Sequence, residues 1–165
     1  MFIYFRHIVK SINLFNMNDL CDFVINTLRI IFVIQYKEYM EKIIINTSNA
    51  PAPIGPYNQA VLVNDTLYIS GQIPINPATG ELNNATLQDE THQSMKNLQA
   101  ILAEAGMDFS SVVKSTIFIT DMNRFAEINE VYAQYFTNNP PARETVQVAA
   151  LPKFVNVEIS MIAVK

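Results

Sequence analysis

All four glycines and all eight prolines of this 165-residue chain lie after residue 40. Residues 1–39 also lack alanine, and Phe, Ile, Asn, Tyr and Lys make up about half of them. Gly and Pro are the residues that most strongly mark turns and loops, so the two segments differ in what they can fold into. The composition predicts an N-terminal extension, residues 1–39, and one domain, residues 40–165.

The extension fits neither a membrane span nor a secretory signal. Its longest apolar run, residues 23–34, is about 12 residues long and contains Arg29, whereas a spanning helix needs about 20. No small-residue cleavage site follows the run. Because AT-rich codons encode the residues that dominate here, we interpret Met40 as the true start and the extension as translated upstream DNA. The alternative is a genuine helix, around residues 18–38, that lies on the domain or on a membrane surface.

Charge and ligand content disfavour several classes of function. The net charge is −4, and from Met40 onwards seven Lys and Arg face twelve Asp and Glu, which disfavours binding to a phosphate backbone. Cys21 is the single cysteine, and His7 and His92 are far apart in the sequence. We therefore expect no disulfide, no metal site and no nucleic-acid partner.

Hydrophobic periodicity and turn signals divide residues 40–165 into eight elements in the order β-β-β-α-β-α-β-β. Asn64-Asp65 predicts a two-residue hairpin turn, Thr86 with Asp89 predicts a capped helix start, and Gly106 suits the end of that helix. The expected strands are 42–46, 59–63, 66–70, 111–120, 143–149 and 154–164. The expected helices are 87–105 and a second one that is capped by Asp121 or Asn123 and ends at about 136.

Two helices and about six strands predict an α+β fold with two layers, in which both helices cover one face of a mixed sheet. The other face carries Tyr68, Thr116 and Phe118 on alternate positions, a mixture of apolar and polar side chains. Such a face is typical of a subunit interface, so we expect a homo-oligomer.

Two charged residues stand in the closing strands. By the period of two, Arg143 alternates with Val146 and Val148, and Glu158 alternates with the apolar residues of the last strand. If the apolar sets face the helices, Arg143 and Glu158 both project from the open face and share a cavity. The alternative is a mutual salt bridge or a solvated sheet face.

Four segments together carry a resemblance to a known family: "NAPAPIGPYNQAV" (49–61), "LYISGQIPINPATGE" (67–81), "DMNRFAEINEVYAQYF" (121–136) and "PPARETVQVAALPKFVNVEI" (140–159). From about Met40 to Lys165 the chain resembles the Rid family, the reactive intermediate imine deaminases, also called the YjgF family. The extension has no counterpart in that family.

The resemblance implies a cytoplasmic, chorismate-mutase-like homotrimer (the YjgF fold) with its sites between subunits. It implies hydrolysis of small 2-imino acids or their enamine tautomers, such as 2-aminoacrylate, to 2-oxo acids and ammonia. It implies no metal, flavin or pyridoxal phosphate, and no membrane partner.

By position in the matching motifs, the resemblance implies that Arg143 binds the substrate carboxylate and that Glu158 positions the attacking water. It places these further residues in the substrate pocket: Tyr57, Ser70, Gly71, Asn123, Phe125 and Thr145. Thr145 replaces a cysteine that is frequent in the family, and the charged Glu144 stands beside the arginine, so the preferred substrate stays open.

Two other classes of function remain as alternatives. The same pocket suits a protein that binds small carboxylates without catalysis, or a chaperone-like surface. An RNA-directed role, as a ribonuclease or translation inhibitor, is known in the family but is disfavoured by the acidic charge balance.

Overall fold

The computed structural model describes residues 17–38 and 41–165. The chain divides into two units, residues 1–41 and Lys42–Lys165, each of which is described by itself. The described elements are α2 (Met17–Glu38), β1 (Lys42–Ile45), β2 (Ala60–Val63), β3 (Thr66–Gln72), α3 (Leu87–Glu104), η2 (Phe109–Ser111), β4 (Val112–Ile119), η3 (Met122–Arg124), α4 (Phe125–Ala133), β5 (Ala142–Gln147), η4 (Pro152–Phe154) and β6 (Val157–Val164).

The first unit contains helix α2, which coincides with the helix that the sequence allows around residues 18–38. Large apolar side chains such as Phe23, Leu28 and Ile30 are exposed on it, and the Thr27 hydroxyl donates to the Phe23 carbonyl at 2.7 Å. None of the helices described is long and apolar enough to cross a membrane. The interpretation of Met40 as the true start stays a prediction, because residues 1–16 and 39–40 lie outside the described residues.

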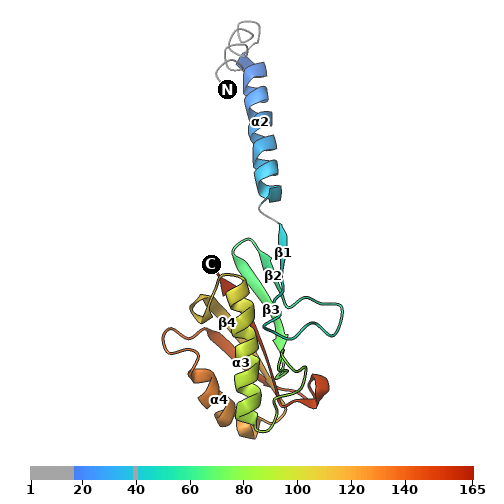
Figure 1. The fold of residues 1–165 in the computed structure, drawn as a ribbon. Helices are drawn as coiled ribbons and strands as arrows, with labels where there is room; N and C mark the ends of the chain where they lie inside the picture. Colours follow the sequence, from blue (N-terminus) through green and yellow to red (C-terminus); the bar gives the residue numbers. More distant parts are fainter. Residues whose placement is uncertain (1–16, 39–40) are drawn as a thin grey trace. The chain divides into compact units, whose positions relative to one another are not determined.

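The second unit is an α+β fold built on one six-stranded sheet (Figure 1). The strand order is β1-β2-β3-β6-β4-β5, with β4 and β5 parallel and the other neighbours antiparallel. Both predicted helices are present, and in Figure 1 α3 and α4 lie on the same side of the sheet. The fold class predicted from the sequence is confirmed in these features.

Local sequence explains where the elements begin and end. The β2–β3 hairpin turns at Asn64, which has a φ of 52°, a conformation that asparagine tolerates better than most residues. The Thr86 hydroxyl accepts the Asp89 N–H at 3.0 Å and so caps α3, and Gly106, with a φ of 69°, follows the last turn. Turn and cap predictions at these positions are confirmed.

The main core lies between the sheet and the two helices. Met95, Leu98, Ile101 and Leu102 of α3 are fully buried, each contributing roughly 1.5–3 kcal/mol by leaving water. The strands β4 and β6 supply the opposing surface, with every second side chain buried from Ser115 to Ile119 of β4 and along β6. Side chains on the other face are half-exposed, as at Tyr68, and the expected homo-oligomer stays a prediction.

The two largest boundary differences from the sequence expectation lie at the end of α4 and the start of the last strand. Helix α4 ends at Ala133, where the sequence predicts about 136. The last strand begins at Val157, and the segment before it forms the short helix η4. Within η4, Lys153 and Phe154 both have a φ of 56°, so the chain bends sharply where the apolar alternation predicts an extended strand.

Phe154 is a strained position that can be tested directly. A bulky side chain in the left-handed region costs about 1–2 kcal/mol, and the Phe154 side chain is 89% exposed, so packing within the chain does not offset that cost. We expect Phe154→Asn to raise the free energy of unfolding by about 1 kcal/mol, measured by urea denaturation.

Val113→Asn is the control, since Val113 is an exposed apolar residue without a positive φ. It should show no such gain. A Phe154→Asn variant that is less stable than the parent would contradict the strain assigned to this turn.

Candidate functional site

Arg143 lies on β5 opposite Ser115 of β4, a fully buried residue on the helix-covered face of the sheet. Its guanidinium therefore points toward α4. Nη1 donates to Asn129 Oδ1 at 2.9 Å, and the guanidinium carbon lies 5.4 Å and 4.9 Å from the ring centres of Phe125 and Tyr132. These distances are in the range of cation–π contacts, so the two aromatic rings orient the Arg143 guanidinium.

The arginine hollow is the open depression around this guanidinium, lined by Asn129, Tyr132, Ala133, Phe136, Pro140, Pro141 and Arg143. Among the described residues Arg143 forms no ion pair, because the two salt bridges found there are Lys114–Glu144 and Arg124–Glu127. A partner with its own carboxylate could occupy the remaining N–H groups of the fork. Burial raises the pKa of the Tyr132 hydroxyl, which keeps that ring neutral beneath the guanidinium.

Glu158 lies on β6 opposite Phe118 of β4, on the face away from the helices. The glutamate hollow that it lines contains Ile54, Tyr57, Ser70, Gly71, Ile73, Pro152 and Glu158. The carboxyl group is half-buried, and this burial raises the pKa of Glu158 above its usual value. A carboxylate with a raised pKa is better suited to accept a proton near neutral pH.

A β-bulge in β3 makes room for the Glu158 carboxylate. The pairing of β3 with β6 shifts between Ile69 and Gln72, and Ser70 and Gly71 occupy the irregular stretch. The Glu158 carboxylate lies directly against Gly71, where a Cβ atom would overlap it. Ser70 is fixed in turn, since its hydroxyl donates to the Asn58 carbonyl at 2.7 Å.

The expectation that Arg143 and Glu158 share a cavity on the open face is wrong for a single chain. Opposite Arg143 on β4 stands Ser115, and opposite Glu158 stands Phe118, three residues further along and on the other face. Because β4 lies between β5 and β6, two strand spacings and three residue rises put their backbones about 14 Å apart. The predicted alternation of side chains along β5 is correct, but the apolar side chains of this strand face away from the helices.

The mutual salt bridge considered as the alternative is also absent between these two described residues. Glu144, next to Arg143, instead points to the open face, where it accepts from the Thr116 hydroxyl at 2.7 Å and pairs with Lys114. These hydrogen bonds, chiefly the one from Lys114, lower the pKa of Glu144. Its charge is thus neutralised away from the arginine hollow.

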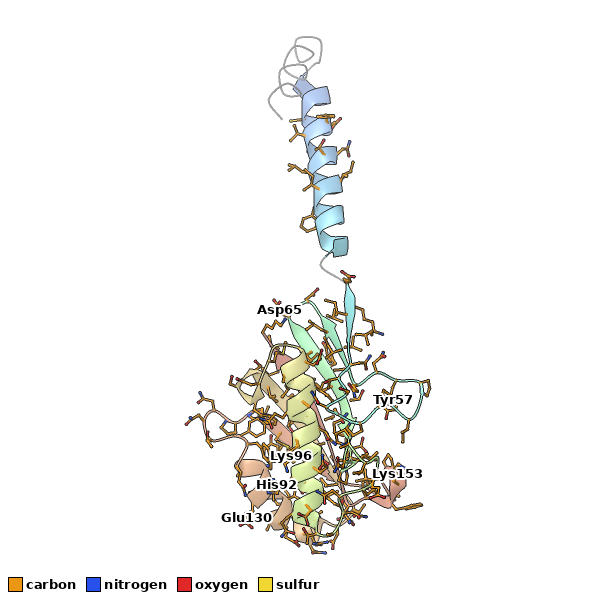
Figure 2. The ribbon with its side chains drawn as sticks, in the orientation of Figure 1. Tyr57, Asp65, His92, Lys96, Glu130 and Lys153 are labelled. Atoms are coloured by element: carbon orange, nitrogen blue, oxygen red, sulfur yellow. The ribbon has the colours of Figure 1, made fainter. Side chains whose placement is uncertain are left out.

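The structure places six of the eight residues predicted for the site in two separate groups. Tyr57, Ser70 and Gly71 join Glu158 in the glutamate hollow, and Phe125 joins Arg143. Figure 2 shows Tyr57 and Lys153 at one side of the domain, and Glu130 of α4, the neighbour of Asn129, at the other.

Asn123 and Thr145 line neither hollow. The Asn123 amide instead donates to Asp121 Oδ1 at 2.9 Å within the η3 turn, and Thr145 lies on β5 opposite Ile117. Asn129 is a contact that the sequence prediction missed. Its signal is its place four residues after Phe125, a polar side chain on an otherwise apolar helix stripe.

No three His, Cys, Asp or Glu side chains of the described residues gather in a manner suited to a metal ion. The second unit is defined by an open mixed sheet, two helices on one face and two hollows on opposite faces, each lined by one charged residue. The family model described as Endoribonuclease L-PSP matches residues 47–165. The chain belongs to this family, whose members are also called YjgF and Rid proteins.

Relatives and solved structures agree with this assignment. The human protein named 2-iminobutanoate/2-iminopropanoate deaminase is 49% identical over 122 residues, which are 74% of this chain and 89% of that protein. A Yersinia pestis protein of the conserved Rid family has 49% identity and a TM-score of 0.74, covering 76% of this chain and 100% of its own. Escherichia coli TdcF with bound serine has 48% identity and a TM-score of 0.72, covering 74% and 98%.

The raised pKa of Glu158 has a consequence for stability. The folded state holds this proton more tightly than the unfolded chain, so stability is full below the unfolded value near 4.5 and declines as the pH rises toward the raised value. Glu158→Gln removes the charge that burial disfavours. We expect a higher melting temperature than the parent at pH 7.5, and an equal one at pH 4 or below, in thermal unfolding.

Glu104→Gln is the control, because Glu104 is exposed on α3 and should shift the melting temperature little at either pH. A Glu158→Gln variant that melts at or below the parent's temperature at pH 7.5 would contradict the burial assigned to this carboxylate.

Proposed function

We propose that the protein hydrolyses small 2-imino acids, and their enamine tautomers such as 2-aminoacrylate, to 2-oxo acids and ammonia. The observation that carries this proposal is a guanidinium held by aromatic rings and an amide, without a carboxylate partner among the described residues. Such a group suits a small substrate that brings its own carboxylate. The named activity of the human relative supports the same reaction.

Each residue has a role in that reaction. Arg143 binds the substrate carboxylate and so fixes the neighbouring imine carbon. With the imine nitrogen protonated, Glu158 accepts a proton from water as the water oxygen attacks that carbon, which gives a neutral tetrahedral carbinolamine. Glu158 then returns this proton to the nitrogen and accepts the hydroxyl proton as the carbon–nitrogen bond breaks, which forms the carbonyl and releases ammonia. An enamine first takes a proton on its terminal carbon to become the imine.

We propose further that the working site lies between two copies of the chain in a homotrimer. The backbones of Arg143 and Glu158 are about 14 Å apart on opposite sheet faces, too far for one small acid to touch both. Pairing the arginine hollow of one protomer with the glutamate hollow of its neighbour would bring them together. The exposed side chains Ile54 and Tyr57 at the second hollow suit coverage by a neighbour.

RNA is a second candidate substrate, because the matching family model is described as an endoribonuclease. The acidic balance of residues 40–165, seven basic against twelve acidic, disfavours it. Incubation of the protein with single-stranded RNA should leave the RNA intact, and cleavage that disappears in Arg143→Ala would favour the nuclease.

The proposed function is tested by the decay of 2-aminoacrylate, generated in place from serine by a dehydratase. We expect the full chain to accelerate the decay, and Arg143→Ala to lose at least about 100-fold in kcat/KM because carboxylate binding and orientation are lost together. Lys96→Ala, which removes an exposed cation of α3, is the matched control and should retain the parent's rate.

A folded parent that binds 2-oxobutyrate but leaves the decay rate unchanged would replace the enzyme with a carboxylate-binding protein. An Arg143→Ala variant that keeps the parent's kcat/KM would remove Arg143 from the site. Sedimentation of the parent and of Arg143→Ala tests the trimer, which we expect in both.

Gly71→Ala tests the place of the Glu158 carboxylate. The new methyl group overlaps the carboxylate, the flexible end of its side chain, so the side chain should move while the fold stays intact. We expect kcat to fall about 10- to 100-fold, with a melting temperature within a few degrees of the parent. Unchanged kcat in this variant would show that the carboxylate works from another position.

A further inference from the structure

Glu90 is a buried carboxylate with no role in the reaction above. It lies in the first turn of α3, and its residue is 1% exposed. Among the described residues it forms no ion pair. A buried carboxylate that forms no ion pair is costly unless hydrogen bonds satisfy it, so the groups that donate to Glu90 account for its burial.

Among the described residues, both hydrogen bonds that the Glu90 carboxylate accepts come from Asn156. The Asn156 backbone N–H donates to Oε2 at 2.7 Å, and its side-chain amide donates to Oε1 at 2.6 Å. Two donors from one residue fix both its backbone and its side chain. The start of α3 also favours a negative charge at this place.

Asn156 in turn contacts the end of β4. Its carbonyl accepts the Thr120 N–H at 3.1 Å, and its Oδ1 accepts the Thr120 hydroxyl at 3.2 Å. Asn156 therefore joins three elements, α3, β4 and β6, at one point. The residues before it form the bend with positive φ at Lys153 and Phe154, so regular pairing does not hold the chain on that side.

Glu158 stands two residues after Asn156, with the fully buried Val157 between them. The position of Asn156 therefore sets where β6 begins and where the Glu158 side chain leaves the sheet. We propose that Glu90 is a positioning residue for Glu158, acting through Asn156. The inference rests on the proposed function for its kinetic consequence, but the clamp itself can be measured without activity.

The inference can be tested by exchanging the carboxylate of Glu90 and the amide of Asn156. Glu90→Gln leaves one acceptor oxygen for two donors, and Asn156→Asp sets two carboxylates against each other. In the double variant Glu90→Gln/Asn156→Asp, the glutamine amide can donate to the aspartate while its oxygen accepts the backbone N–H of residue 156. The aspartate still accepts from Thr120, so every hydrogen bond of the cluster can form again.

We expect each single variant to lower kcat about 10- to 100-fold, with KM and the Kd for 2-oxobutyrate within about 2-fold of the parent, since Arg143 is untouched. The double variant should recover kcat to within about 3-fold of the parent. A purely structural defect would instead lower the active fraction and leave the kcat per folded molecule unchanged.

Amide hydrogen exchange of residues 156–159 is the readout that needs no activity. Exchange should be faster in both single variants and return to the parent's rate in the double variant. Thr120→Val removes a single partly exposed hydroxyl and should give a smaller change in the same direction, which covers the case in which a single variant does not fold. Glu104→Gln makes the same chemical change as Glu90→Gln on the exposed side of α3 and should change nothing.

Loss of kcat and of protection in the single variants, with recovery of both in the double variant, would support the inference. Folded single variants with the parent's kcat or the parent's exchange rates would overturn it, as would a folded double variant without recovery. A parent that does not accelerate imine decay would overturn the proposed function instead, and the exchange rates alone would then decide whether Glu90 holds this segment.

Discussion

The pairing of β4 with its two neighbours is the constraint on which the rest of the structure depends. Strand β4 is antiparallel to β6 and parallel to β5, and side chains in a strand alternate between faces. The register therefore assigns Arg143 to the helix-covered face and Glu158 to the open face. A shift of one residue in either pairing would move the charged side chain of that strand to the opposite face of the sheet. The register therefore determines where each of these two groups can act.

The two hollows differ in the electrostatic state of their charged group. At the first, Phe125, Tyr132 and Asn129 orient a guanidinium without neutralising it, which leaves a place for an incoming carboxylate. At the second, burial against Gly71 makes the Glu158 carboxyl a better proton acceptor. The proposed meeting of the two hollows between protomers would bring substrate, anchor and base together.

Glu90 shows how the scaffold and the site are connected. Its buried carboxylate contributes nothing to the apolar core around Met95 and Leu98, yet it fixes Asn156 at the junction of α3, β4 and β6. The neighbouring η4 turn is strained at Lys153 and Phe154. A rigid anchor beside a strained turn keeps the start of β6, and with it Glu158, in one position.

The sequence by itself determined the elements, the caps and the hairpin turn at Asn64, because these depend on neighbours within a few positions. It also gave the grouping of Tyr57, Ser70 and Gly71 with Glu158 through the family resemblance. It could not assign the face of Arg143, since the alternation of β5 is the same whichever side the helices cover. The tertiary structure decided that face, the start of β6 at Val157 and the contact of Glu90 with Asn156, because each depends on pairing between residues far apart in the chain.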